Sequence, residues 1–351
     1  MNETPLSRSF DEEDLAAAVA AGVVPAATAE AFLGFVAARR EDAPRADDEE
    51  VRFITSFNDV FVTLGVLLVC GGLAFLLGRH SIGWAAAAVA VVAWGLAELF
   101  SRRWLMAFPS IVLTGIVVAA AGTAAVAVLD GPASEDFAGL AGAAAACAVG
   151  TLHWRRFRVP ISVAAAAAAA GVFVVALVHL AVPDLIERHT NMVILSLGLL
   201  VFALAMWWDA SDRDRRTRRT DVAFWLHVLA APAIVHPLTS AAGIRLDDLA
   251  VGQAGFVLAL FAVIAAVALI IDRRAVLVSA LIYLGVSIGV LIERTGWSTA
   301  SGGPATVGLV GAVILLLAVG WRPLRAVALR LAPARLRAIV PPPAAPRGSR
   351  P

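Results

Sequence analysis

Long apolar runs alternate with short polar segments along most of the chain, a pattern that predicts a protein crossing a membrane about ten times. Runs of about 18 or more apolar residues are typical of transmembrane helices. Ten such runs cover approximately 58–78, 82–100, 105–129, 137–154, 159–182, 191–208, 222–240, 252–271, 275–292 and 305–321. The predicted fold class is therefore all-α, a polytopic transmembrane helix bundle of about ten helices that occupies residues 51–321.

The first 50 residues have a different pattern, which predicts a small helical hairpin followed by a charged linker. Ser9 and Glu12 have the spacing of a capping box, Gly22 ends the first helix, and Pro25 suits the first turn of the second. The apolar positions of the hairpin follow the acidic segment DEED rather than a basic one. A signal peptide is therefore not expected.

The distribution of arginine predicts the orientation in the membrane. All 28 basic residues are arginines. Both terminal regions and the loops after the second, fourth, sixth and eighth runs hold 24 of them, whereas the opposite loops hold only Arg79, Arg188, Arg245 and Arg294. Because basic residues are enriched in cytoplasmic loops, both termini are expected in the cytoplasm, with an even number of spans.

The end of the chain, residues 322–351, is basic and then rich in proline. The segment RPLRAVALRLAPARLRAIV spaces arginines among apolar residues and is expected to lie along an anionic lipid surface. The final PPPAAPRGSRP is typical of a disordered, polyproline-like tail.

Small residues dominate the runs at 137–154 and 159–182. Ala138, Gly142, Ala146 and Gly150 recur at every fourth position, and residues 164–170 are all alanine. Small residues let helices in lipid approach closely, which would place these two helices centrally in the bundle. Alanine enrichment from codon bias is the alternative explanation.

The polar residues inside the apolar runs form a candidate intramembrane site of His227, Pro232, His236 and His179. Proline within a helix leaves a carbonyl unpaired, and broken helices in membranes often line substrate sites. His227 and His236 are nine residues apart and fall on opposite faces of a straight helix, so they would share a metal only if the helix broke. Hydrogen-bonded packing histidines beside a kink are the simpler interpretation.

A second candidate site is the charged loop between the sixth and seventh runs. It contains Asp212, Arg213, Arg215, Arg216, Arg218 and Arg219. It is interpreted either as a solvated, self-neutralising loop or as a docking surface for a cytoplasmic partner.

The remaining composition argues against several classes of function. The net charge is +1, so no nucleic-acid partner is expected, and Cys70 and Cys147 lie in separate apolar runs, where packing is favoured over a redox role. No nucleophile elbow, phosphate-binding loop, CxxC, HExxH or dinucleotide-binding glycine pattern occurs. An enzyme is not expected, and neither is a cofactor.

The segments EDLAAAVAAGVVPAATAEAFLGFVAARR, FNDVFVTLGVLLVCGGLAFLLG and RRTDVAFWLHVLAAPAIVHPL resemble those of a family of predicted bacterial inner-membrane proteins. These proteins have a short cytoplasmic helical domain, eight to ten hydrophobic helices and no assigned activity. The resemblance implies the bacterial inner membrane as location and carries no catalytic residues.

Two functions follow as expectations. The first is a non-enzymatic membrane protein that organises or regulates a cytoplasmic or membrane protein partner through its hairpin, central loop and basic end. The second is a secondary transporter of a small neutral or apolar solute, because ten spans with both termini inside match the topology of drug/metabolite-type carriers.

Overall fold

The computed structural model describes residues 12–42, 57–129, 135–213, 215, 217–244, 251–294 and 299–341. Throughout these ranges the regular elements are helices, which confirms the predicted all-α fold class. The chain divides into two compact units, Met1–Asp48 and Glu49–Pro351.

The first unit contains the predicted hairpin. Helix α1 spans Glu12–Ala20 and α2 spans Ala26–Asp42. Gly22 adopts φ +73°, and its N–H donates to the carbonyl of Val19 at 3.0 Å. A left-handed residue of this kind ends a helix at low cost only when it is glycine. The charged linker was predicted at 39–50, but its first four residues belong to α2, and Ser9 and residues 43–50 lie outside the described residues.

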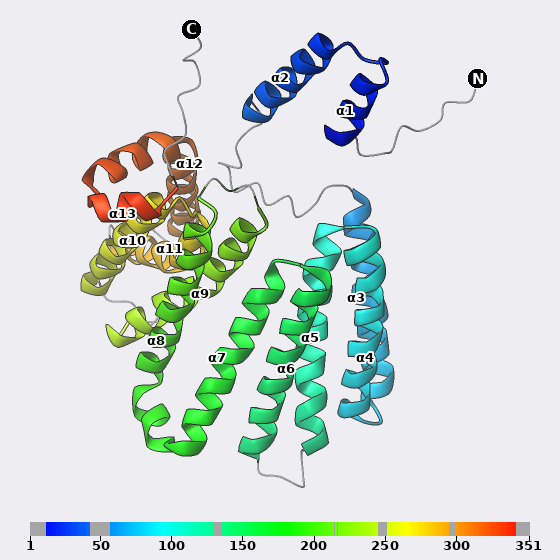
Figure 1. Cartoon of the computed structure of the whole chain (residues 1–351). Helices are drawn as coiled ribbons and strands as arrows, with labels where there is room; N and C mark the ends of the chain where they lie inside the picture. The colour runs from blue at the N-terminus through cyan, green and yellow to red at the C-terminus, as the bar shows by residue number, and fades with distance from the viewer. Residues whose placement is uncertain are drawn as a thin grey trace. The chain divides into compact units, whose positions relative to one another are not determined.

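The second unit contains the long apolar helices (Figure 1). Their bounds are α3 Phe57–Gly78, α4 Ile82–Ala97, the π-helix η1 Glu98–Arg103, α5 Ala107–Leu129, α6 Glu135–Phe157, α7 Ile161–Ala181, α8 Pro183–Ala210, α9 Arg219–Ala241, α10 Val251–Ile271, α11 Ala275–Arg294, α12 Thr299–Leu331 and α13 Ala334–Ile339. Within the described residues, nine helices are long and apolar enough to cross a membrane, and α11 contributes the shorter apolar stretch Ser279–Ile292.

Two predicted boundaries were wrong. Helix α8 begins at Pro183 rather than near residue 191, because proline suits the first helical position and needs no N–H partner there. A kink at His189, where φ is −129°, separates residues 183–188 from the rest of α8. Helix α12 continues through Pro323 to Leu331 rather than ending at residue 321, so much of the basic segment extends the last apolar helix.

Large apolar side chains cover the outer faces of the peripheral helices. Phe75 on α3, Trp84 on α4 and Val319 on α12 are 74%, 79% and 84% exposed. Soluble monomers rarely expose contiguous apolar surfaces of this kind, whereas a bilayer solvates them. The architecture is that of a multi-pass membrane protein.

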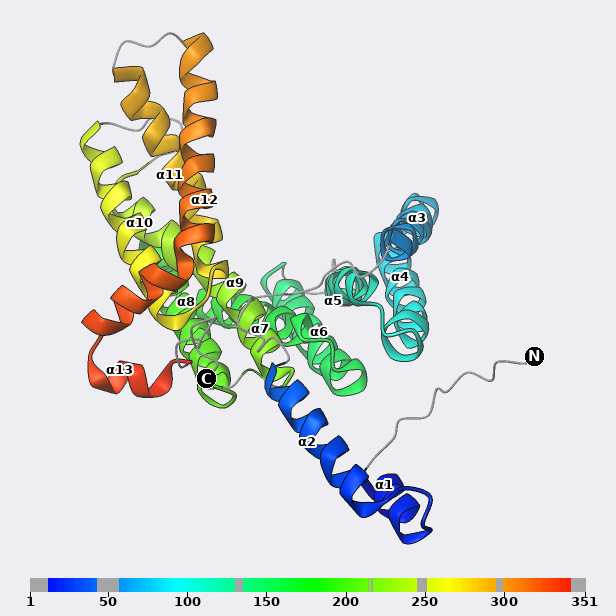
Figure 2. The ribbon, with the colours of Figure 1, turned by 90° about the horizontal axis from the view of Figure 1, so that it is seen from above.

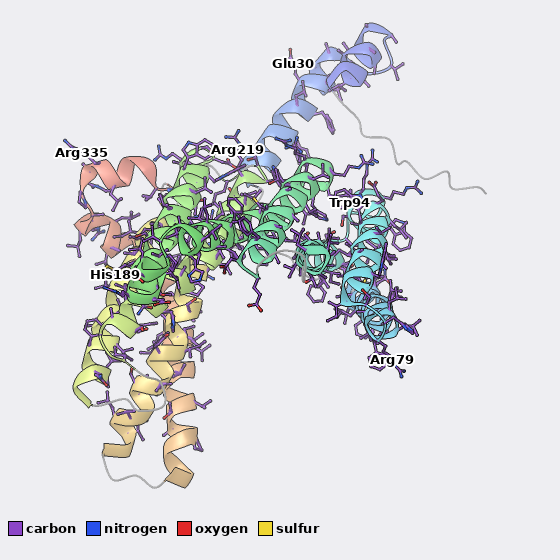
Figure 3. The ribbon with its side chains drawn as sticks, turned by 90° about the horizontal axis from the view of Figure 1, so that it is seen from below. Glu30, Arg79, Trp94, His189, Arg219 and Arg335 are labelled. Atoms are coloured by element: carbon purple, nitrogen blue, oxygen red, sulfur yellow. The ribbon has the colours of Figure 1, made fainter. Side chains whose placement is uncertain are left out.

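Consecutive helices pack against one another along the chain. Helices α3 to α7 form one series of neighbours, α8 and α9 form the most extensively packed pair, and α9 also contacts α7 and α11. Helices α10, α11 and α12 lie side by side (Figure 2). Arg79 follows α3 and lies at the opposite end of the α3–α4 pair from Trp94 (Figure 3).

Close packing explains the small residues of α6. A Cβ atom on Gly142 would lie 3.0 Å from the carbonyl oxygen of Gly122 on α5, and one on Gly150 would lie 3.2 Å from the Cα of Ala166 on α7. These distances leave no room for a side chain. They support the packing interpretation of the small-residue ladder.

Gly198→Val is expected to destabilise the protein by about 1–3 kcal/mol through overpacking. A Cβ at Gly198 would lie 2.9 Å from the carbonyl carbon and oxygen of Ala233, so α8 and α9 would have to separate. Unfolding of the purified protein by titration with SDS in mixed micelles measures the change. Gly171→Val on α7, where a Cβ meets no atom within 4 Å, is the matched control. An equal loss in both variants would contradict the steric explanation.

Candidate functional site

A buried acid, a histidine and an arginine from three different segments meet near the end of α8. Asp209, at the end of α8, is 2% exposed and lies between His227 of α9 and Arg273 of the α10–α11 loop. The Nε2 of His227 is 3.1 Å from Asp209 Oδ2, and Arg273 donates from Nε to the same oxygen at 3.0 Å and from a terminal nitrogen to Oδ1. This two-pronged guanidinium–carboxylate pair is the strongest type of protein ion pair.

A second buried acid, Asp272, precedes Arg273 in the sequence and is contacted by a different set of donors. Arg215 of the α8–α9 loop lies 3.0 Å from Asp272 Oδ2 and also donates to its carbonyl oxygen at 2.9 Å. From α12, Trp321 donates its indole N–H at 2.7 Å, and Arg325 lies 3.5 Å from Oδ1. Asp272 therefore links two loops to the last long helix.

The segment after α13 is hydrogen-bonded to the same region through its backbone carbonyls. Arg325 donates to the carbonyl of Pro341 at 2.7 Å, and Arg213 donates to that of Val340 at 3.1 Å. Six ionisable residues thus form one connected region, which we term the charge network: Asp209, Arg215, His227, Asp272, Arg273 and Arg325. It joins the α8–α9 loop, the α10–α11 loop, α12 and the segment after α13.

Backbone strain coincides with this network. Arg215 has φ +53° and Asp272 has φ +59°, conformations that side chains other than glycine rarely adopt. Each costs on the order of 1 kcal/mol or more, and such residues persist where surrounding contacts determine them. Because the two strained residues are ion-paired to each other, the pair holds both turns in place.

The predicted intramembrane residues do not gather into one site. His236 is hydrogen-bonded through Nδ1 to the hydroxyl of Tyr283 at 2.9 Å, and His179 lies 4.0 Å from Asp136, whereas His227 belongs to the charge network. Pro232 is exposed on α9, which runs without interruption from Arg219 to Ala241. In the described part of the chain, no three His, Cys, Asp or Glu residues are arranged to hold a metal ion.

The predicted docking loop is extensively bonded within the protein. Asp212 accepts hydrogen bonds from the backbone and hydroxyl of Thr217 at 2.8 and 2.6 Å. Arg218 donates to the carbonyl of Arg158 at 3.3 Å, and the guanidinium of Arg219 lies 5.9 Å from the ring of Trp208. Arg213 and Arg215 make the contacts described above, and Arg216 lies outside the described residues. Of the loop arginines, only Arg215 is buried among those that the structure describes.

Glu98, the first residue of η1, pairs with Arg102 four residues later at 3.3 Å. The structure adds Arg156 of α6, which donates to both carboxylate oxygens of Glu98 at 2.7 and 3.0 Å. The π-helix η1 begins at Glu98 and is therefore fastened to the end of α6.

A cavity of about 250 Å³ lies beside these contacts. It is bounded by η1 and the start of α5, the α6–α7 loop and the start of α9. The charged and polar residues of its lining are Ser101, Ser110, Arg158, Arg218 and Asp221, and apolar residues such as Phe157 and Trp225 complete it.

Sequence reasoning missed Asp209, Asp272, Arg273 and Arg325 as site residues. One signal was available: an acid directly follows an apolar run at both Asp209 and Asp272, in loops that topology places on the same side. It also passed over His153, which is fully buried and lies 2.8 Å through Nδ1 from the hydroxyl of Ser162.

The two carboxylates of the charge network are surrounded by guanidinium and N–H donors from other segments, an arrangement that can hold those segments in one geometry. No family model matches the chain, and no curated protein or solved structure matches it.

Proposed function

We propose that this protein is a non-enzymatic organising or regulatory protein of the bacterial inner membrane. Both termini and the arginine-rich loops, those after the second, fourth, sixth and eighth apolar runs, lie in the cytoplasm. The observation that carries the proposal is the charge network, which fixes the α8–α9 loop, the α10–α11 loop and the segment after α13 as one surface. Buried ion pairs contribute little net stability compared with apolar packing, so their value lies in fixing a particular arrangement.

The chemistry of this surface indicates the kind of partner. Arg213, Arg335 and Arg337 are exposed around the network, and Arg219 adds a fourth exposed guanidinium at the start of α9. A protein partner with an acidic surface in the cytoplasm or at the membrane would complement them, and complementary charge mainly sets association rate and specificity.

The test is gentle extraction of the tagged protein from its native membrane, followed by native mass determination and identification of bound proteins. A stoichiometric partner is expected, and the double variant Arg335→Glu, Arg337→Glu should reduce its occupancy about tenfold or more, equivalent to ~1.4 kcal/mol. Arg79→Glu, an exposed arginine in a loop of the opposite set, is the matched control. Recovery without any protein partner, or equal occupancy in all variants, would contradict the proposal.

Transport of a small solute is the second candidate, and the cavity beside α9 favours it. The buried pair of Asp209 and Arg273, at the end of α8 and in the α10–α11 loop, also supplies charged residues of the type that proton- or ion-coupled carriers use. A small molecule retained by a partner-free protein would shift the assignment to transport. Uptake of that molecule into proteoliposomes should then depend on His227, so His227→Gln should abolish it and His80→Gln, exposed in the α3–α4 loop, should not.

A further inference from the structure

The cavity contains features of an anion site that the charge network does not use. Three helices begin at its wall: Ala107 is the first residue of α5, Ile161 the first of α7, and Arg218 immediately precedes α9. Each helix N-terminus carries a partial positive charge and N–H groups without intrahelical partners. The N-cap residues of α7 and α9 make no side-chain cap, although the Arg219 N–H donates to Thr217 Oγ1 at 3.2 Å and the Ser162 N–H to the Val159 carbonyl at 3.0 Å.

An unpaired buried hydroxyl provides independent evidence for a ligand. Ser101 is 5% exposed and lines the cavity, and its Oγ has no hydrogen-bond partner in the part of the chain that the structure describes. Buried polar groups without partners are rare in folded proteins and call for an explanation such as a bound group. Ser101 also belongs to the π-helix η1, and π-helical turns are frequent at functional sites.

The charges of the lining suit a phosphodiester. Arg158 and Arg218 are exposed at the cavity, and Asp221 is half-buried between them and the bundle. The two guanidinium groups and one carboxylate give the lining a net charge of +1, which complements the single negative charge of a phosphodiester. A carboxylate in the same cavity can accept a hydrogen bond from an ammonium or hydroxyl group on the same headgroup.

The position of the cavity at the ends of apolar helices favours a lipid ligand over a soluble one. Its lining comes from the ends of the apolar helices α5, α6, α7 and α9, and Leu105 beside it is 71% exposed. Basic pockets between transmembrane helices on the cytoplasmic side can bind anionic lipid headgroups. The strained backbone of Leu105 and Arg158, with φ +51° and +56°, shapes two of the bounding turns.

We propose that this cavity binds the phosphodiester headgroup of a phospholipid from the adjacent leaflet. The phosphate lies against Arg158, Arg218 and the three helix N-termini, with Ser101 as a further donor. Asp221 accepts a hydrogen bond from the ammonium group of phosphatidylethanolamine or a hydroxyl of phosphatidylglycerol. This inference does not depend on the proposed partner.

The experiment is native mass spectrometry of the full-length protein after delipidation, with phosphatidylethanolamine or phosphatidylglycerol added back. Phosphate-free diacylglycerol and soluble glycerol 3-phosphate are the two comparison ligands. One phospholipid should bind, and the double variant Arg158→Gln, Arg218→Gln should weaken it at least about tenfold because two basic groups are lost. Asp221→Asn should weaken phosphatidylethanolamine more than phosphatidylglycerol.

Two further variants test whether binding depends on the cavity itself or only on the positive charge of the protein. Ala107→Leu fills the cavity while keeping every charge, so it should also prevent binding. Arg103→Gln, Arg155→Gln removes two exposed arginines from the same loop regions outside the lining and should bind as the wild type does.

Equal binding by wild type and the lining variants would overturn the proposal, and so would equal binding of diacylglycerol. Binding of glycerol 3-phosphate without phospholipid would overturn the lipid source and assign the cavity to a soluble phosphate ester.

Discussion

Asp209→Ala is expected to destabilise the protein by about 3–5 kcal/mol, because it removes the carboxylate to which the buried guanidinium of Arg273 donates two hydrogen bonds. Arg273 is 1% exposed and directs two nitrogens at this carboxylate, and His227 loses its hydrogen-bond partner in the same substitution. The measurement is the free energy of unfolding by SDS titration in mixed micelles. Asp184→Ala, which removes a pair whose side chains are 73% and 76% exposed, should cost less than about 1 kcal/mol.

A double variant distinguishes an unpaired charge from a general packing defect. Asp209→Leu, Arg273→Met replaces both partners with apolar groups of similar size, and such replacements of buried ion pairs are often neutral or stabilising. The double variant should therefore be more stable than Asp209→Leu or Arg273→Met alone. If it were instead as unstable as the sum of the two single changes, the ion pair would not be the cause.

The fold class could be predicted because the membrane imposes a simple rule on sequence. Every backbone group in lipid must be hydrogen-bonded within its own segment, so long apolar runs become helices. This constraint was sufficient to locate α3 to α12. It was insufficient at Pro183 and Pro323, because a proline can begin a helix or lie within a long one, and neighbouring helices determine which.

The charge network could be predicted only as a set of charged residues at the ends of apolar runs. Asp209, Asp272 and Arg325 are separated by more than fifty residues each in the sequence. Their pairing depends on the packing of α9 against α11 and α11 against α12, which helical periodicity does not specify. For the histidines, the sequence favoured hydrogen-bonded packing over a shared site, and tertiary packing gives His227 and His236 different partners.

Asp272→Ala should cost a similar amount, about 3–5 kcal/mol, because two buried arginines lose their shared counter-ion. Arg215 and Arg325 are 7% and 5% exposed, and Trp321 loses its acceptor as well. Alanine at φ +59° adds backbone strain that asparagine tolerates better. Asp272→Asn should therefore be less destabilising than Asp272→Ala, while still removing the negative charge that Arg215 contacts at 3.0 Å.

The same substitution should also loosen the segment after α13, which distinguishes it from Asp209→Ala. Arg325 joins Asp272 to the carbonyl of Pro341, so loss of the acid removes the group that orients this donor. Hydrogen exchange of backbone amides in 334–341 should accelerate in Asp272→Ala under native conditions, where the bundle remains folded. Asp136→Ala, an exposed acid at the start of α6, should change neither exchange nor stability by more than about 1 kcal/mol. Unchanged exchange in Asp272→Ala would mean that the segment is held by apolar contacts of Val340 rather than by the charge network.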